Sequence, residues 1–210
     1  MGAKANLYEF SYRKTTKEGI NFLATDLGDR ILQLKEGNNT PIHPTCPAAH
    51  LNVNEIANVV NNSEMNVHVN ADAHEIMQAV RADVLEKLNK SDVGISGANS
   101  IAAEDGSIVL IHNEGNINLI ISKKLHIVVA GIDKIVPTVE DAVGIAKLET
   151  VYATGKTITS YMNVISGPSK TADIEERIFK KMYGAEKVVV IFLDNGRSTA
   201  FNECLWCIGC

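Results

Sequence analysis

The chain has 210 residues, of which 45% are apolar and 21% are charged, and its 25 acids against 20 bases give a net charge of −5. This composition excludes a disordered chain, and the acidic balance argues against a general nucleic-acid or membrane-surface binder. No apolar run approaches the ~20 residues of a membrane span. The polar N-terminus lacks the apolar region of a signal peptide. We therefore expect a soluble, globular, cytoplasmic protein.

Residues that favour buried strands are abundant. The sequence contains 22 isoleucines and 19 valines, whereas aromatic residues make up only 5%. Such β-branched residues are typical of strands that are buried on both faces, as in parallel sheets covered by helices. The composition therefore predicts the α/β class, with a mainly parallel sheet flanked by helices.

The first half of the chain is predicted to be mainly helical. Residues 20–25 and 30–34 resemble short extended segments, and three prolines between Pro41 and Pro47 predict a rigid loop. Helices are predicted over 52–61 and 72–89. The second has Asp72 as its N-cap and apolar residues at three-to-four spacing.

From Asp92 onward, short apolar runs alternate with glycines. Strands are predicted over 93–96, 107–112, 117–122, 126–131, 157–165 and 187–193, with an antiparallel hairpin over 107–122. Helices are predicted from Thr138 to about 153, closed by Gly155, and over 171–183. The continuous run KVVVIFL over 187–193 predicts the centre of a parallel sheet.

Three of the four cysteines crowd the C-terminal segment: Cys204, Cys207 and Cys210. Their C-x2-C-x2-C spacing is typical of three thiolate ligands of a 4Fe–4S cluster, and zinc is the second interpretation. A cubane needs four ligands and this run supplies three. We expect either that the natural protein continues beyond Cys210 or that no cluster assembles in this chain alone.

Polar residues follow the apolar run 187–193 directly: Asp194, Asn195, Gly196 and Arg197. In open α/β sheets, ligands bind at the carboxyl ends of the strands. Arg197 is a candidate clamp for an anionic substrate, Asn195 a candidate binding group, and Asp194 a candidate proton-transfer group. A plain strand-end turn with a paired Asp and Arg is the equally weighted alternative.

Other candidates are weaker. Gly97 and Asn99 follow a predicted strand, where small residues permit close backbone approach to a ligand. Asn113 and Glu114 lie in a predicted hairpin turn, in which Glu114 is a candidate catalytic carboxylate. Ser169 precedes a predicted helix and could cap it or help to bind an anion. His43, Cys46 and His50 have ligand-type side chains, but solvated side chains are the favoured interpretation, and His126 is treated as structural.

Several blocks, taken together and in order, resemble the LUD (lactate-utilisation) domain family, in particular its iron–sulfur members. They are TDLGDRILQL, HPTCPAAH, DVGISGANSIAAEDGSIVLIHNEGNINLI, VVAGIDKIVPTVEDA, SGPSKTADIE, LDNGRS and CLWCIGC. The resemblance covers 18–210. It implies a LUD-type α/β domain over 1–200, followed by the start of a truncated ferredoxin-type segment over 201–210.

The resemblance also implies a fold like that of ribose-5-phosphate isomerase, glucosamine-6-phosphate isomerase and the CoA transferases. It implies a component of an iron–sulfur electron-transfer system that oxidises L-lactate, or a related 2-hydroxy acid, to pyruvate together with other lactate-utilisation subunits, one of them an iron–sulfur protein. Two alternatives stay open. One is a transferase or isomerase that binds CoA, a nucleotide or a phosphosugar, with Glu114 as nucleophile or base. The other is a non-catalytic scaffold.

Overall fold

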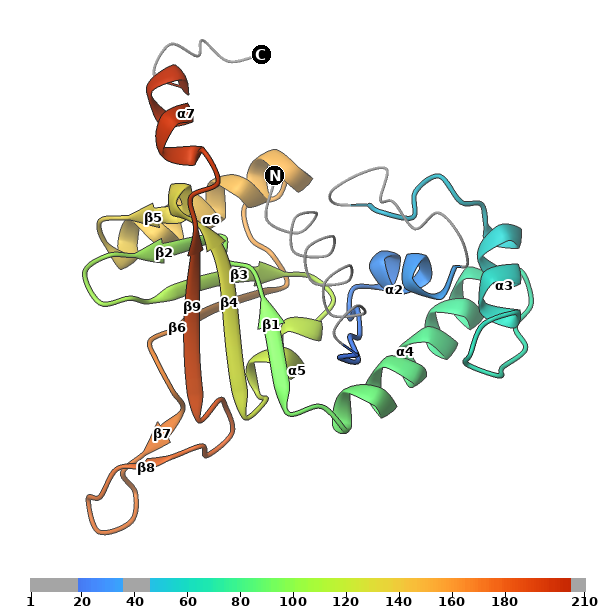
Figure 1. Ribbon diagram of the computed structural model, residues 1–210, viewed down its shortest axis with the longest axis horizontal. Helices are drawn as coiled ribbons and strands as arrows, with labels where there is room; N and C mark the ends of the chain where they lie inside the picture. The colour runs from blue at the N-terminus through green and yellow to red at the C-terminus, as the bar shows by residue number, and fades with distance from the viewer. Residues whose placement is uncertain (1–18, 36–45, 205–210) are drawn as a thin grey trace. The chain divides into compact units, whose positions relative to one another are not determined.

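The computed structural model describes residues 19–35 and 46–204. Contacts within the chain separate two compact units, one ending at Ser91 and the other beginning at Asp92. The described part of the first unit contains the helices α2 (Leu27–Leu34), α3 (Val53–Asn61) and α4 (Ala73–Asn89) (Figure 1).

Side-chain caps set the starts of these three helices. Asp26 accepts a hydrogen bond from the backbone N–H of Gly28, and Asp72 accepts one from Glu75. Asn52 and Glu55 form a reciprocal capping box at α3. The predicted helices over 52–61 and 72–89 are confirmed.

The extended segment predicted over 30–34 is wrong, because these residues lie in α2. Asp26-Leu27-Gly28 resembles a turn in the sequence, but Asp26 acts as the N-cap of a helix. Ile31, Leu32 and Leu34 are buried, and α2 contacts both α3 and α4. Tertiary packing of this apolar face supplies most of the stability of so short a helix.

The second unit contains strands, helices and one 3-10 turn. In chain order they are β1 (Val93–Ser96), β2 (Ser100–Ala102), β3 (Ile108–His112), α5 (Asn116–Ile121), β4 (Leu125–Gly131), η1 (Ile132–Lys134), β5 (Ile135–Val136), α6 (Val139–Thr154), β6 (Tyr161–Ile165), β7 (Lys170–Thr171), β8 (Phe179–Lys180), β9 (Lys187–Leu193) and α7 (Arg197–Cys204).

A parallel sheet with the order β1-β4-β9 forms one layer of this unit. Ser96 of β1 is opposite Val128, and β9 pairs with β4 along its whole length, from Lys187 opposite Leu125 to Leu193 opposite Gly131. With α5 packed against β1, the predicted α/β class with a parallel sheet and flanking helices is confirmed. The predicted central position of 187–193 is wrong: among the described strands, β9 pairs only with β4 and is an edge strand.

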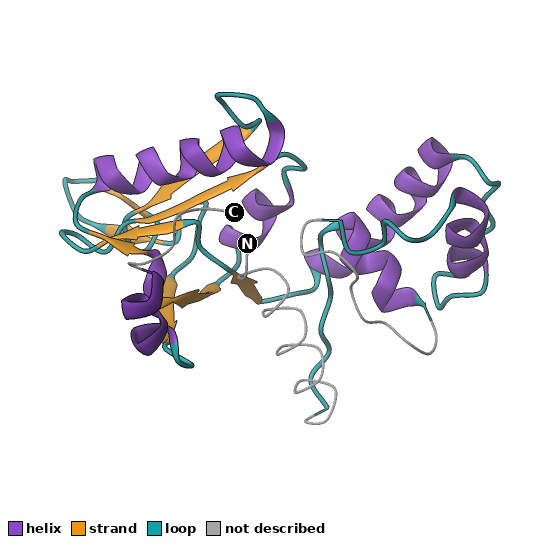
Figure 2. Ribbon diagram, turned by 90° about the horizontal axis from the view of Figure 1, so that it is seen from above, coloured by secondary structure: helices purple, strands orange, loops and turns teal. Residues whose placement is uncertain are grey.

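A second sheet, with the order β5-β2-β3-β6, packs against the first. Its β3 is antiparallel to both β2 and β6. Apolar side chains from the two sheets meet in one core: Ala98, Ile101, Ile108, Leu110, Val128 and Ala130. The long helix α6 lies across the other face of this sheet, where Ala142 and Ala146 contact Ala102 and Val109 (Figure 2). Thr138 and the left-handed Gly155 cap α6 as the sequence predicts.

The hairpin predicted over 107–122 is wrong. The sequence predicts 117–122 as its second strand, but 116–121 form the helix α5, and β3 pairs instead with β2 and β6. Gly115 has a left-handed backbone, with φ of 85°, as a hairpin turn would allow, but it is the N-cap of the helix α5. A short apolar run has no readable period, so a strand and a buried helix turn cannot be told apart.

The helix predicted over 171–183 is also wrong, and with it the capping role that Ser169 could have had. The segment holds the short strands β7 and β8, and Glu175, Glu176 and Lys181 have positive φ. Its apolar side chains are largely exposed, Ile178 by 70% and Tyr183 by 83%. Without packing of its apolar face, an isolated helix of this length is marginal. The strand predicted over 157–165 begins only at Tyr161.

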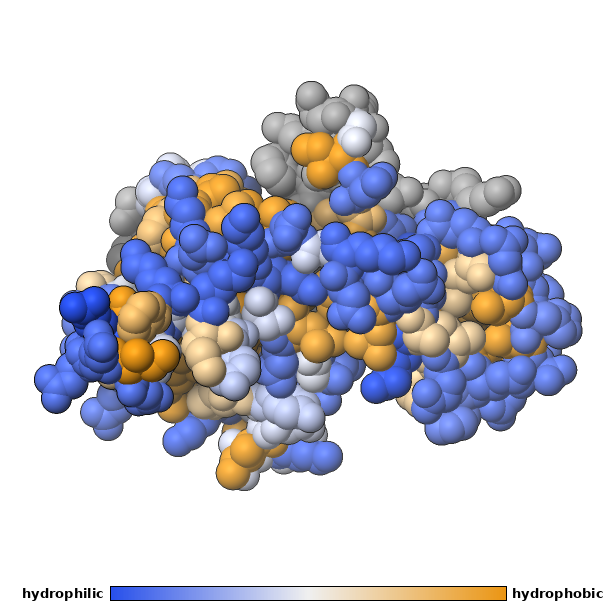
Figure 3. All heavy atoms as spheres, turned by 90° about the horizontal axis from the view of Figure 1, so that it is seen from below, coloured by the Kyte–Doolittle hydropathy of each residue, from blue (hydrophilic) through white to orange (hydrophobic). Residues whose placement is uncertain are grey.

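Exposed apolar side chains are not confined to this segment. On α6, Leu148 and Tyr152 face solvent. The face seen in Figure 3 likewise shows apolar side chains among hydrophilic ones. None of the helices in the described ranges is both long and apolar enough to cross a membrane.

Candidate functional site

The carboxyl ends of the parallel strands lie at one edge of the first sheet. At this edge β4 ends at Gly131 and runs into η1, while β9 ends at Leu193 and leads through a turn into α7. Because ligands of open α/β sheets bind beyond the carboxyl ends of the strands, a ligand site is expected at this edge.

An ion pair joins the two segments that follow β4 and β9. Nε of Arg197 lies 2.6 Å from Oδ1 of Asp133, and the arginine side chain is 23% exposed. Both side chains lie close against the backbone of Gly131, because a Cβ at this position would overlap Asp133 Oδ1 and Arg197 Nε. A larger residue at 131 would therefore have to displace the side chains of this pair from their observed positions.

Asp194 holds the start of α7. Its carboxylate accepts hydrogen bonds from the hydroxyl of Ser198 at 2.6 Å and from the Ser198 backbone N–H at 2.8 Å. These bonds, the hydroxyl bond first, hold the pKa of Asp194 below its usual range. The group is thus ionised near neutral pH. Asn195 and Gly196 form the turn with positive φ, as the strand-end turn interpretation predicts.

A second polar chain connects Asn99 to the same edge. Asn99 Nδ2 donates to Glu149 on α6 at 2.6 Å, and its Oδ1 accepts from the backbone N–H of Ile111. Glu149 in turn pairs with Lys134 at 2.8 Å. Because Lys134 is adjacent to Asp133 in η1, the two polar chains meet there. Asp133, Lys134 and Glu149 are not among the residues that the sequence indicates. The position of η1 directly after β4 is a signal for Asp133 and Lys134, and nothing in the sequence signals Glu149 on α6.

Gly97 lies between β1 and Asn99, and its carbonyl accepts a hydrogen bond from the hydroxyl of Ser96 at 2.9 Å. Its backbone therefore has a defined structural partner within β1 itself.

Asn113 and Glu114 follow β3 directly. The side-chain oxygen of Asn113 accepts from both the backbone N–H and the hydroxyl of Ser160 at 3.2 Å. The turn also rests on His112, whose ring stacks on Tyr161 with centroids 4.9 Å apart. Nδ1 of His112 accepts from the Gly115 N–H, which orients the residue after Glu114. His112 is a further polar residue of this turn that the sequence did not indicate.

Ser169 does not join these residues. It lies after β6, where its backbone N–H donates to Ala185 O and its hydroxyl accepts from the Tyr183 N–H at 3.4 Å. Ala185 precedes β9, so Ser169 is near the amino end of the parallel sheet, opposite the edge that holds Arg197.

The cysteine segment begins where the described chain ends. Cys204 is the last residue of α7, whereas Cys207 and Cys210 lie outside the described residues. His43 lies outside them as well, and Cys46 is exposed. Within residues 19–35 and 46–204, no cluster of three or more His, Cys, Asp or Glu side chains is arranged to hold a metal ion.

His126 is a buried polar residue of β4, with no exposed surface. Its Nε2 lies 2.8 Å from the hydroxyl of Ser96 on β1. Burial lowers the pKa of His126 from 6.5 to about 4, because the charged imidazolium would lose its hydration. The ring is therefore neutral at physiological pH.

This shift makes stability depend on pH. Below pH 6.5 the unfolded chain binds a proton at His126 that the folded chain excludes until about pH 4. The contribution of neutral His126 to the free energy of unfolding is complete above pH 6.5. It is lost as the pH falls from 6.5 to about 4, by about 3 kcal/mol in all, at 1.36 kcal/mol per pKa unit. The free energy of unfolding in urea is measured for the wild type and for His126→Phe at about pH 7.5 and about pH 5. Between these two pH values it should fall by about 2 kcal/mol less in the variant than in the wild type. Equal falls would contradict the assignment.

These observations define the class of protein: an α/β domain with a parallel sheet, at whose carboxyl edge Arg197 pairs with Asp133, while Asn99 is linked through Glu149 to Lys134. Comparison with known families then places the chain. The LUD domain family matches residues 3–193, so the chain belongs to the LUD domain family.

Two similar curated proteins carry the same name. The chain is 35% identical over 199 residues to lactate utilization protein B of Anoxybacillus flavithermus, covering 92% of this chain and 40% of that protein. It is 33% identical over 199 residues to lactate utilization protein B of Bacillus subtilis, again with 92% and 40% coverage. The chain thus spans about 40% of the length of these relatives.

Among solved structures, a DUF162 family protein from Deinococcus radiodurans is similar to this chain. The two share 20% sequence identity with a TM-score of 0.34, over 51% of this chain and 56% of the other.

Proposed function

We propose that this chain is the LUD domain of a lactate-utilisation system and that it binds a small 2-hydroxy carboxylate at the carboxyl edge of the β1-β4-β9 sheet. The similarity to lactate utilization protein B over 92% of the chain carries the assignment to lactate utilisation. The placement of Arg197 at the carboxyl end of β9, beside the end of β4, supports the location of the site.

Arg197 is the group that we assign to the substrate carboxylate. Asp133 takes the Nε hydrogen of the guanidinium. A guanidinium carries four more N–H bonds on its two Nη atoms, in the planar arrangement that a carboxylate accepts. Asn99 and Asn195 would orient the hydroxyl. Because Asp133 and Glu149 already pair with the cations here, a substrate anion must compete with them, and we expect weak binding.

Oxidation of a 2-hydroxy acid to the 2-oxo acid removes two electrons and two protons, one from the hydroxyl and one from the carbon. A base must accept the hydroxyl proton, and the two electrons and the second proton must pass to an acceptor that a partner protein of the system would supply. Asp194 is bound by Ser198, and its lowered pKa makes it a weak base. By elimination, Glu114, which follows β3 of the second sheet, is the acid that we assign to the proton-transfer role, among the two that the sequence singled out.

Cys204, Cys207 and Cys210 are the proposed ligands of an iron–sulfur cluster. Three thiolates at this spacing have the donor chemistry of a 4Fe–4S site, which supplies one-electron transfer when the cluster is bound. The fourth ligand and the acceptor of the electrons would come from another segment or from a partner iron–sulfur protein of the system.

The test uses the full chain, reconstituted anaerobically with iron and sulfide. Titration with L-lactate is compared with titration with L-lactamide, which has the same hydroxyl and methyl groups but no carboxylate. We expect L-lactate alone to bind, and Arg197→Ala to weaken that binding at least tenfold, as expected for hydrogen bonds to a charged group. Arg177→Ala is the matched control, because that arginine is 76% exposed and pairs only weakly with Glu175 at 3.7 Å.

Two results would refute the proposal. If lactamide bound as well as lactate, or if Arg197→Ala and Arg177→Ala bound lactate equally, the carboxylate site would lie elsewhere. For the cluster, iron and sulfide content is compared between Cys204→Ser and Cys46→Ser. A loss confined to the first variant supports ligation by the C-terminal segment, and equal contents in both contradict it.

A further inference from the structure

The outer side of the helix α6 carries a stripe of apolar side chains. Ile145, Leu148 and Tyr152 recur at a spacing of three and four residues, which places them along one side of the helix. All three are exposed, Leu148 by 54% and Tyr152 by 88%. The proposed lactate site uses none of them.

The opposite side of α6 is the one that packs within the unit. Ala142 and Ala146 are fully buried there, against Ala102 and Val109 of the second sheet. Figure 2 shows the sheet on this side of α6, with no element of the second unit on the other side. The outer side of such a surface helix is ordinarily polar. Because α6 is apolar on both sides, its outer stripe has the composition of an interaction surface.

Opposite charges lie at the two ends of the stripe. Asp141, in the first turn of α6, precedes Ile145 by four residues and is therefore on the same side of the helix. Lys156 comes directly after Gly155, the left-handed residue at which the helix ends. Both residues are exposed, and neither forms an ion pair with another residue in the described ranges.

A stripe with an acid at its start and a base at its end is complementary to a second copy of itself in the opposite direction. In an antiparallel pair of α6 helices, Asp141 of each copy lies beside Lys156 of the other, while Ile145 and Leu148 of both copies meet at the centre. Tyr152 then lies near the first turn of the other copy. A parallel pair would instead bring like charges together at both ends.

We propose that the outer side of α6 is an interface between two copies of this chain, in which the two α6 helices pack antiparallel about a two-fold axis. The symmetry makes every contact occur twice. One side of a single helix is a small interface, so we expect a weak dimer that forms only at high protein concentration. The proposal goes beyond the lactate site and does not depend on it.

Sedimentation velocity of the full chain at rising concentration tests the dimer. The buffer contains a reductant and a chelator, so that the cysteines cannot link two copies through a disulfide or a metal. We expect Leu148→Glu to raise the dissociation constant of the dimer at least about thirtyfold, as for a residue at the centre of an interface. Ile178→Glu is the matched control, because Ile178 is equally apolar and exposed but lies outside α6, and it should have no effect.

A charge exchange tests the antiparallel direction. Asp141→Lys and Lys156→Asp should each weaken the dimer by about five- to thirtyfold, since an exposed ion pair is replaced by like charges at both ends of the interface. An equimolar mixture of the two variants should dimerise as well as the wild type, because each reversed charge then faces an opposite one. Mixing cannot rescue a variant that has merely failed to fold.

Four results would overturn the proposal. They are a chain that stays monomeric up to about 0.5 mM, a dimer that Leu148→Glu leaves unchanged, equal effects of Leu148→Glu and Ile178→Glu, and a mixture of the charge variants that dimerises no better than either alone. The first would leave the stripe to a different protein. Loss of lactate binding in Arg197→Ala bears on the lactate site alone, so the two proposals fail separately.

Discussion

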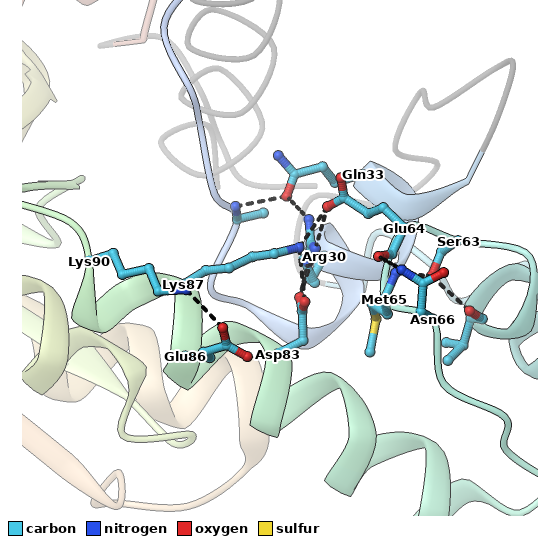
Figure 4. A network of polar contacts seen from close by, with 12 residues as sticks. Arg30, Gln33, Ser63, Glu64, Met65, Asn66, Asp83, Glu86, Lys87 and Lys90 are labelled. Atoms are coloured by element: carbon cyan, nitrogen blue, oxygen red, sulfur yellow. Dashed lines mark hydrogen bonds and ion pairs between the residues drawn. The ribbon is translucent and has the colours of Figure 1, made fainter.

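Replacing Arg30 by alanine should lower the free energy of unfolding of the first unit by about 3 kcal/mol, the lower end of the usual cost of removing one member of a buried ion pair. Arg30 is only 2% exposed. Its guanidinium donates twice to Asp83, at 2.7 and 3.1 Å, and also to Gln33 and Glu64 (Figure 4). The alanine variant leaves the Asp83 side chain, itself only 11% exposed, with Lys87 as its remaining cation.

Lys90→Ala is the matched control for this experiment. Its partner Glu86 lies at 2.8 Å, but both side chains are 72% exposed, and such surface pairs contribute little. Urea unfolding followed by circular dichroism should show a large shift in the midpoint for Arg30→Ala and almost none for Lys90→Ala. Similar shifts would mean that Arg30 does not carry the contacts that join α2 to α4.

Gly94→Ala should lower the stability of the second unit by about 3 kcal/mol, at the upper end of the usual cost of overpacking. Gly94 lies in β1 where α5 crosses it. A Cβ at this position would overlap the carbonyl oxygen of Ile120 and lie 2.8 Å from the Cγ2 atom of its side chain. A backbone carbonyl cannot rotate away as a flexible side chain can, so α5 would have to move off the sheet.

Gly144→Ala provides the opposite case in the same unit. Gly144 is in the interior of α6, and no heavy atom lies within 4 Å of the position of a Cβ. The substitution should stabilise the chain by about 0.5–1 kcal/mol through helix propensity alone. Thermal unfolding of both variants makes the comparison. A Gly94→Ala variant as stable as the wild type would show that α5 does not pack this closely on β1.

Elements with strong local signals were predictable from the sequence. For α6, Pro137-Thr138 and Gly155 indicated both ends, and the structure shows a capping bond at Thr138 and a left-handed Gly155. For α4, Asp72 indicated the start of the helix, and the structure shows its capping bond. Caps act through neighbouring residues, so a single sequence carries all the information that they need.

Short apolar segments were not predictable in the same way. Residues 116–121 form a helix because α5 fits between β1 and β3, and this depends on chain segments distant in sequence. Residues 171–183 have a helical spacing, but Ile174 and Ile178 remain exposed, so no packing rewards a helix there.

The residues of the candidate site also differ in whether the sequence predicts them. The position of Arg197 after a long apolar strand was readable, because β9 and the turn that follows it are adjacent in sequence. Its partner Asp133 and the pair Lys134–Glu149 were not, because these contacts arise only when η1, α6 and α7 come together.

The hydrogen bond between Ser96 and His126 also helps to select one alignment of β1 on β4. In the observed alignment Gly94 is opposite His126 and Ser96 is opposite Val128, so the bond runs diagonally between the strands. A slip of two residues would keep every side chain on its original face, and the hydrophobic pattern alone would oppose it only weakly. The same slip would separate Ser96 from His126 and leave a buried imidazole nitrogen unpaired. The Ser96–His126 hydrogen bond thus favours one alignment of β1 on β4 over another that would bury nearly the same apolar side chains.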